Sequence, residues 1–210
     1  MQILLLAATE AEIQSIKTNH PAIDVLITGV GAPATIYQLQ KKIGQQPYDL
    51  VVQAGVAGSF NDQIKLGTVV LVGQDCFADL GTEENGHFLP MGKTAFADEH
   101  AYPFENGWLK NPNRFLLNTH LPVTRAITVN KVSDSQLQKQ QFIETWNPDI
   151  ESMEGAALHF VCLQEKLPFI QIRSVSNYVG ERDKTKWKLH EAIASLHAEL
   201  TALLTQFTTL

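Results

Sequence analysis

Arginine is scarce in this chain of 210 residues, which has only four. None lies before Arg114, and the formal net charge is −6. A protein that binds nucleic acid normally carries a stripe or patch of basic residues, and the sequence shows none. The composition therefore argues against a nucleic-acid partner.

Cysteine is just as scarce, and metal-binding motifs are missing. Cys76 and Cys162 both lie in apolar runs without the spacing of metal ligands. We interpret them as buried free thiols in a reducing compartment, which favours the cytoplasm. The seven histidines show no paired spacing, and neither H-E-x-x-H nor C-x-x-C occurs. No metal site is expected.

Long apolar runs and a complete cofactor motif are missing too. The first apolar run ends at Thr9 without a positively charged segment before it, so we expect a buried strand rather than a signal peptide. No run approaches the roughly 20 apolar residues that cross a bilayer, and no membrane partner is expected. Gly29 and Gly31 could open a dinucleotide fingerprint, but Ala34 replaces its third glycine. No cofactor is expected.

What the sequence does contain is an alternation of apolar runs with helical patterns. We predict strands at residues 2–8, 24–28, 49–53, 68–73, 125–130 and 167–175. We predict helices at residues 10–17, 35–43, 134–145, 153–166 and 184–207, of which 153–166 is strongly amphipathic. This order predicts an α/β fold, a three-layer α/β/α sandwich with a mixed, mainly parallel central sheet. Without a visible linker, residues 1–210 are expected to form one domain.

Polar residues and glycines gather where the predicted strands end. Strand 49–53 is followed by a predicted glycine loop that contains Gly55, Ala57 and Gly58. Ligands of such sheets bind beyond the carboxyl ends of the strands, so we expect the site there. Residues 79–121 form a long irregular stretch, and loops of that length are usually functional.

Three segments at these strand ends could carry chemistry. They centre on Glu12, Glu154 and Asn177. Each has an ordinary structural explanation: acidic residues favour the start of a helix, and asparagine is a common turn residue. Taken together they predict one pocket, because all three lie in segments expected at the carboxyl ends of strands, namely 9–12, 151–154 and 174–182.

These segments carry a resemblance that runs along nearly the whole chain. It covers A-T-E-A-E-I at 8–13, T-G-V-G at 28–31, A-G-V-A-G at 54–58, F-A-D-L-G at 77–81, M-E-G-A-A at 153–157 and S-N-Y-V-G-E-R-D at 176–183. The sequence resembles the methylthioadenosine/S-adenosylhomocysteine nucleosidases and, more closely, the futalosine hydrolases of menaquinone biosynthesis. Both groups belong to the purine nucleoside phosphorylase superfamily.

The resemblance implies roles for the matching residues. Glu154 would accept hydrogen bonds from the ribose hydroxyls, with Met153 packed under the sugar. Glu12 would activate water. Asn177 would be catalytic and contact the base, with Ser176 orienting its amide. Val132 and Ser133 match, more loosely, the segment that sandwiches the base.

Asn177 also bears on the choice of base. Nucleosidases that release adenine have Asp at this position. An amide can donate to N7 and to a 6-oxo group, which a carboxylate would repel. This departure favours a 6-oxopurine nucleoside, and futalosine carries hypoxanthine. The substrate tail at C5′ would then meet Arg182, Tyr178 or Trp187, although Arg182 beside Glu181 and Asp183 could equally form a surface ion pair.

Other functions stay open at the level of sequence. Phosphorylases of the superfamily hold phosphate with arginines near the first and third strands, where this chain has none. Hydrolysis is therefore favoured over phosphorolysis. A methylthioadenosine-type nucleosidase and a non-catalytic nucleoside-binding protein remain alternatives, but a binding protein would have no use for a water-activating Glu12. The resemblance also implies a homo-oligomer, with a dimer favoured.

Overall fold

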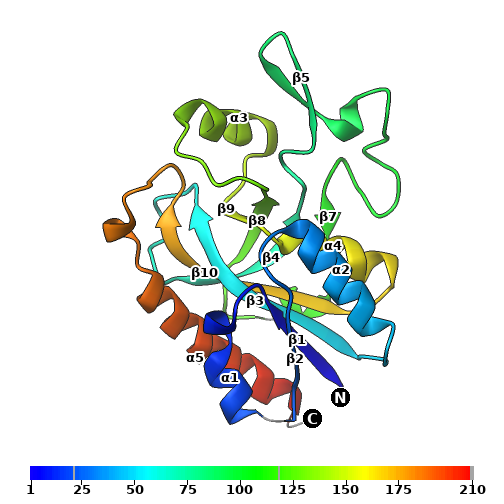
Figure 1. Cartoon of the computed structure of the whole chain (residues 1–210), viewed down its shortest axis with the longest axis vertical. Coiled ribbons are helices and arrows are strands. Elements are labelled where there is room, and N and C mark those ends of the chain that lie inside the picture. The colour runs from blue at the N-terminus through cyan, green and yellow to red at the C-terminus, as the bar shows by residue number, and fades with distance from the viewer. Residues whose placement is uncertain (21, 118, 209–210) are drawn as a thin grey trace.

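The computed structural model describes residues 1–20, 22–117 and 119–208 (Figure 1). The strands are β1 (Ile3–Ala7), β2 (Asp24–Ile27), β3 (Leu50–Ser59), β4 (Val69–Asp75), β5 (Gly81–Glu84), β6 (His87–Pro90), β7 (Leu109–Lys110), β8 (Val123–Thr128), β9 (Ile150–Ser152) and β10 (Phe169–Tyr178). The α-helices are α1 (Gln14–Asn19), α2 (Ala32–Ile43), α3 (Gln136–Trp146), α4 (Gly155–Gln164) and α5 (Leu189–Thr208). Short 3-10 helices are η1 (Glu10–Glu12), η2 (Met91–Lys93), η3 (Arg114–Leu117) and η4 (Lys184–Lys186).

The central sheet is mixed, and one side of it closes on itself. Its strand order is β10-β4-β8-β9-β3-β1-β2, with β7 added at β4. Strand β10 also pairs with β3, in parallel, so β3, β10, β4, β8 and β9 form a ring. Strands β1 and β2 extend from β3 in parallel. This confirms the predicted mixed sheet and adds the closure, which alternation of elements could not reveal.

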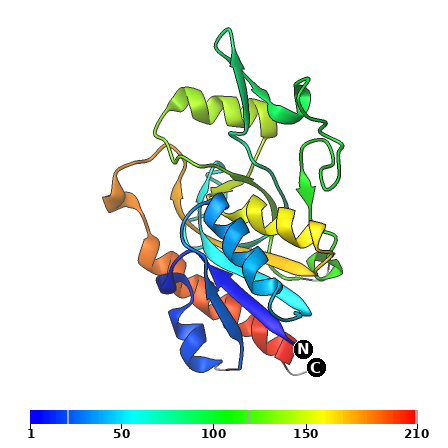
Figure 2. The same ribbon diagram turned by 45° about the vertical axis from the view of Figure 1, so that its right-hand side comes forward.

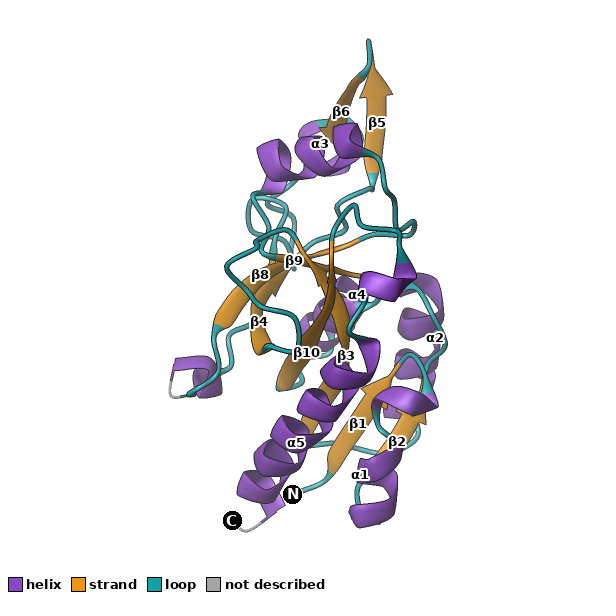
Figure 3. Cartoon of the chain, turned by 90° about the vertical axis from the view of Figure 1, so that its left-hand side faces the viewer, coloured by secondary structure: helices purple, strands orange, loops and turns teal. Residues whose placement is uncertain are grey.

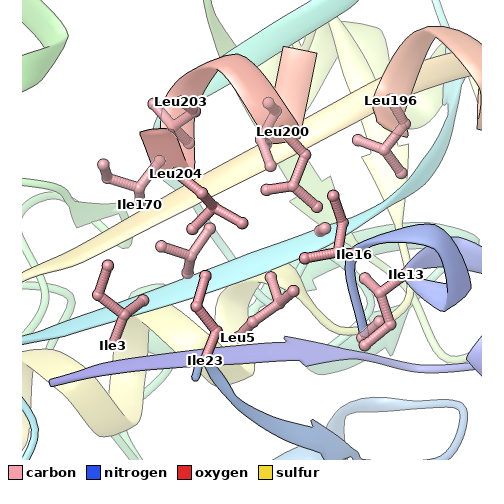
Figure 4. Close-up of a cluster of buried hydrophobic side chains, with 14 of the residues drawn as sticks. Ile3, Leu5, Ile13, Ile16, Ile23, Ile170, Leu196, Leu200, Leu203 and Leu204 are labelled. Atoms are coloured by element: carbon pink, nitrogen blue, oxygen red, sulfur yellow. The ribbon is translucent and has the colours of Figure 1, made fainter. Parts of the chain in front are cut away.

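Helices cover both faces of the sheet, as predicted for three layers. Figure 3 shows α5 and α1 on one side of the strands and α2 and α4 on the other. The first side is closed by an aliphatic cluster in which Leu5 of β1 and Ile16 of α1 meet Leu196 and Leu200 of α5 (Figure 4). The second side packs Leu4 and other residues of β1 and β3 against α2 and α4. Odd-numbered and even-numbered residues of β1 therefore pack into two different cores, because successive side chains of a strand point to opposite faces of the sheet.

The predicted irregular stretch contains a small hairpin. Strands β5 and β6 pair with each other apart from the main sheet, and they project beyond α3 in Figures 1 and 2. The base of this region is anchored by Trp108, whose ring packs edge-on against Trp146 of α3 with 5.5 Å between the ring centroids. No helix in the described ranges is long and apolar enough to cross a membrane.

Three helix predictions need correction. The predicted helix 10–17 is split into η1 and α1. The predicted helix 184–207 is interrupted, because Trp187 is extended (ψ 134°) between η4 and α5. The predicted amphipathic helix 153–166 is instead α4, which is buried on most of its surface. It lies between the sheet and α2, and Phe104 from the irregular stretch packs on its Phe160.

The predicted glycine loop is wrong as well. Gly55, Ala57 and Gly58 lie inside β3, which runs on to Ser59 because β10 continues beside it to Tyr178. Neither glycine has a positive φ, so turn geometry does not explain them. A β-carbon on Gly55 would collide with the Arg173 guanidinium. These glycines make room for neighbouring side chains instead.

Candidate active site

A cavity of about 360 Å³ opens where β1, β3, β9 and β10 end. Its walls combine apolar surface with a few acidic and amide side chains, which is the usual composition of a small-molecule site. The lining residues are Ala8, Thr9, Ala11, Glu12, Val30, Val56, Ala57, Gly58, Val132, Glu151, Ser152, Met153, Glu154, Ser176, Asn177, Trp187, Leu189 and Ile193.

Glu12 is held rigidly at one side of this cavity. Its Oε2 accepts hydrogen bonds from the backbone N and from Oγ1 of Thr9, both at 3.0 Å. Its Oε1 accepts from the backbone N of Val56 at 3.1 Å. Only 7% of the residue is exposed. Three donors thus fix a carboxylate that still faces the cavity, as a base for bound water would require.

Glu154 is the second fixed carboxylate. It precedes α4 directly, and its Oε1 accepts from the backbone N of Gly31 at 2.9 Å. Its Oε2 lies 3.8 Å from Nη1 of Arg173. A carboxylate oxygen can accept more than one hydrogen bond, so both oxygens retain capacity for ligand hydroxyls.

Arg173 is a buried cation that lies 3.8 Å from Glu154 and packs against Gly55, as Glu12 does. It is 1% exposed, and its Nη2 donates to Oε1 of Gln53 at 2.9 Å. A β-carbon at Gly55 would meet this guanidinium and would lie 3.0 Å from Oε1 of Glu12. The guanidinium and the Glu12 carboxylate therefore pack against the same glycine. A fully buried arginine needs such partners, because an unpaired buried charge is strongly unfavourable.

Asn177 lies at another part of the cavity, at a β-bulge in β10. The register with β3 shifts between Val175 and Asn177, and bulges commonly re-aim side chains beside active sites. Its Oδ1 accepts from Ser176 Oγ at 2.9 Å, and its Nδ2 donates to the backbone O of Tyr178 at 3.2 Å. The hydroxyl of Ser176 thereby fixes which way the amide points. The second N–H of Nδ2 is left for a ligand.

Glu151 is a third acidic residue at the cavity. It is 6% exposed, and burial raises the pKa of its carboxyl from 4.5 to about 7, while the nearby charges of Arg182 and Lys139 act to lower it. A β-carbon on Gly58 would lie 3.4 Å from its Cγ and 3.3 Å from Nδ2 of Asn177. Glu151 and the Asn177 amide are therefore neighbours across Gly58.

The structure brings together most of the residues expected at the site. Glu12, Glu154, Met153, Ser176, Asn177, Val132, Ala57, Gly58 and Trp187 line the cavity. Others lie outside its lining. Gly55 packs behind the carboxylates, and Ser133 lines a small adjoining hollow. Arg182 is exposed, and its guanidinium carbon lies 5.8 Å from the centre of the Trp187 ring.

Two residues at the site received no role from the sequence. The available signal for Arg173 was its position inside an apolar strand, because a buried arginine must have a partner for its charge. Glu151 gave a weaker signal, since it lies two positions before Met153 in a segment already of interest. Leu189 and Ile193 at the start of α5 also line the cavity. Both lie in the first turns of α5, so the residue at which this helix begins determines whether their side chains reach the cavity.

The cavity therefore holds two fixed carboxylates and an oriented amide, which are groups able to bind a sugar, a water and a base. Comparison with known families agrees: the Phosphorylase superfamily profile matches residues 12–208. The chain belongs to this superfamily, as the sequence motifs predicted.

Relatives of known function narrow the class. The chain is 30% identical to futalosine hydrolase of Thermus thermophilus over 86% of this chain and 80% of that protein. It is 29% identical to the futalosine hydrolase of Streptomyces coelicolor, over 82% and 74% of the two chains. The prediction of a nucleoside N-glycosyl hydrolase is thereby confirmed.

Solved structures share the fold at lower identity. Methylthioadenosine/S-adenosylhomocysteine nucleosidase of Helicobacter pylori, with butyl-thio-DADMe-Immucillin-A, superposes with a TM-score of 0.80 at 18% identity, over 98% of this chain and 99% of that one. Futalosine hydrolase of the same species gives 0.78 at 16% identity over 98% of both chains. These likenesses confirm the predicted α/β fold.

Proposed function

We propose that this enzyme hydrolyses the N-glycosidic bond of futalosine and releases hypoxanthine. The observation that carries the proposal is the pairing of two fixed carboxylates, Glu12 and Glu154, with the oriented amide of Asn177 in one cavity. Relatives named futalosine hydrolase support the choice of substrate. More distant relatives are named methylthioadenosine/S-adenosylhomocysteine nucleosidase, so an adenine-releasing nucleosidase is the second candidate.

The geometry supports a division of labour along the substrate. Cleavage of the bond builds positive charge on the sugar and negative charge on the base. Glu154 would accept from the ribose hydroxyls, and its negative charge favours the cationic sugar. The Nδ2 group of Asn177 would donate to the base as it gains negative charge. Met153 would pack its thioether under the sugar.

Water is the proposed nucleophile. Glu12 faces the cavity with both oxygens fixed, and it would take a proton from water as the water oxygen bonds to the sugar carbon. The bond from that carbon to the base nitrogen breaks, its electron pair leaves with the base, and the base takes a proton from solvent water. Arg173 packs against the same glycine as Glu12, and it is not free to bind phosphate, because it is 1% exposed and bonded to Gln53. This placement favours hydrolysis over phosphorolysis.

Turnover assays separate the candidates. The protein is incubated with futalosine, inosine, methylthioadenosine and adenosine, with and without inorganic phosphate, and the released bases are separated by chromatography. Release of hypoxanthine from futalosine without phosphate is expected. Strict dependence on phosphate would identify a phosphorylase, and faster release of adenine would favour the second candidate. Binding of these nucleosides without any turnover would indicate a nucleoside-binding protein.

The cellular setting is part of the proposal. Futalosine hydrolysis would place the enzyme in menaquinone biosynthesis in the cytoplasm. A homodimer is proposed from the family resemblance. Val30 at the cavity and Tyr37 on α2 offer exposed apolar surface, with 59% and 63% exposure. Light scattering of the purified protein measures the oligomeric state.

A further inference from the structure

The proposed mechanism gives the Glu151 carboxyl no role, although this residue is buried at the cavity. It occupies the middle of β9, where its backbone pairs with Gly58 of β3 and Ile127 of β8. Its side chain faces the cavity and an adjoining hollow that Lys139 also lines. Strand pairing on both sides leaves the side chain little freedom to turn away from this position.

Its surroundings differ from those of the other two acids at the site. Glu12 accepts three hydrogen bonds and Glu154 accepts one from a backbone N–H. No residue in the described parts of the chain donates a hydrogen bond to the Glu151 carboxyl. Buried carboxylates normally have such donors, and leaving them out is costly. The Glu151 oxygens are open to the cavity, so a bound ligand can supply the donor that the described residues do not.

The position relative to Asn177 indicates which part of the ligand that is. Gly58 separates the two side chains. A β-carbon built on Gly58 would lie within 3.4 Å of both Cγ of Glu151 and Nδ2 of Asn177. A β-carbon at residue 58 would thus crowd both. Asn177 is the residue assigned to the base, so Glu151 lies at the base end of the cavity.

The two bases under consideration differ in what they present to such a pair. A 6-oxopurine has acceptors at N7 and O6 and a donor at N1–H. Adenine has a donor at its 6-amino group and an acceptor at N1. An amide that donates and a carboxylate that accepts match the 6-oxopurine, whereas adenine N1 would face the carboxylate with lone pair against lone pair.

We infer that Glu151 accepts a hydrogen bond from N1–H of a 6-oxopurine base, and so determines base specificity together with Asn177. This inference rests on the proposed function for its choice of ligand class. Burial raises the pKa of the Glu151 carboxyl to about 7, and no hydrogen bond from the described residues offsets this rise. Arg182 and Lys139, whose charges lower that pKa, help to keep the ionised form available near neutral pH.

The decisive variant is Glu151→Gln, which keeps the volume and replaces an acceptor oxygen with a donor amide. The assay measures kcat/KM for inosine and adenosine in wild type and variant. The ratio is expected to shift toward adenosine by about tenfold to hundredfold, because site groups left unpaired by the wrong base discriminate strongly. The matched control is Glu144→Gln on α3, an exposed carboxyl outside the cavity lining. Its ratio should equal that of wild type.

A second pair of measurements guards against a purely steric effect. Inosine and 1-methylinosine differ at N1, and wild type should prefer inosine. Glu151→Ala should reduce that preference to within about threefold, because the acceptor is gone. Thermal denaturation checks that each variant folds. Unchanged ratios in both folded variants would overturn the inference, and so would an equal shift in Glu144→Gln.

Binding of free bases separates this inference from the proposed function. Calorimetry of hypoxanthine and adenine with wild type and Glu151→Gln requires no turnover. If futalosine is not cleaved but the variant still reverses the base preference, the proposed function fails and the role of Glu151 stands. If futalosine is cleaved and the variant binds both bases as wild type does, only the role of Glu151 fails.

Discussion

Glu12→Gln is the most informative single change, because the structure predicts its effects on chemistry and on stability separately. If Glu12 activates water, the neutral amide cannot take the proton. The expected loss in kcat is about 10²- to 10⁴-fold, which is typical for removal of a general base. The affinity for the nucleoside should change by no more than about threefold, because the loss concerns the transition state.

The stability effect follows from the three donors around the carboxylate. Two belong to Thr9 and one to the backbone N of Val56. A glutamine has one acceptor oxygen, so its NH₂ group must face either the Thr9 donors or the Val56 N–H. A buried donor left without an acceptor costs about 1–3 kcal/mol, and the donors here are only partly buried, which favours the lower part of that range. The free energy of unfolding should fall by an amount in this range.

Three measurements test these expectations on one sample. Steady-state kinetics with futalosine gives kcat, calorimetry gives the nucleoside affinity, and urea denaturation gives the unfolding free energy. Glu10→Gln is the matched control, since Glu10 lies two residues earlier in η1 and is exposed beside Lys17. A Glu12→Gln enzyme whose kcat stays within about threefold of wild type would refute the general-base role.

Further predictions concern the other site residues. Glu154→Gln should raise the nucleoside Kd and lower kcat together, since ribose contact and Arg173 pairing are both lost; an unchanged Kd would contradict the ribose role. Asn177→Asp should lower the inosine-to-adenosine ratio of kcat/KM by at least about tenfold, whereas an unchanged ratio would assign base recognition elsewhere. Arg182→Ala should raise KM for futalosine by about tenfold without affecting inosine, and equal losses would indicate a structural role. Glu151→Gln should stabilise the empty enzyme relative to wild type as pH rises. The folded-state pKa of Glu151 is raised to about 7. The contribution of this carboxyl to the free energy of unfolding is therefore fully present below pH 4.5 and is lost as the pH rises toward 7. The variant avoids that loss, which is worth up to about 3 kcal/mol; urea denaturation at pH 5 and pH 8 measures it, and an equal difference at both pH values would contradict it.

The sequence by itself determined the layered α/β architecture and the neighbourhood of the site. Buried parallel strands need apolar side chains on both faces, so the runs that became β1 and β4 stand out in any window. The carboxyl ends of such strands converge at one edge of a sheet. This convergence is why Glu12, Glu154 and Asn177 could be grouped before their positions were known.

Predictions from local sequence patterns were wrong for the elements whose boundaries or burial depend on residues distant in the sequence. The run after Gln53 looked like a glycine loop, but it continues as strand because β10 pairs with it as far as Ser59. The helix α4 looked amphipathic, yet α2 and the segment at Phe104 cover its outer side. In both cases the deciding contacts come from residues more than 40 positions away, which no local window contains.

The chemistry of Arg173 and Glu151 was decided only by the tertiary structure. Ionisable residues in apolar surroundings have no fixed role until their partners are placed. Folding sets Arg173 between Gln53 and Glu154, against Gly55, where its charge is paired. Folding sets Glu151 beside Gly58, where no residue of the described ranges donates to its carboxyl, and burial raises its pKa. The sequence specified which charges the chain carries, and the closed ring of strands determined that Arg173 is paired and that Glu151 lines the cavity.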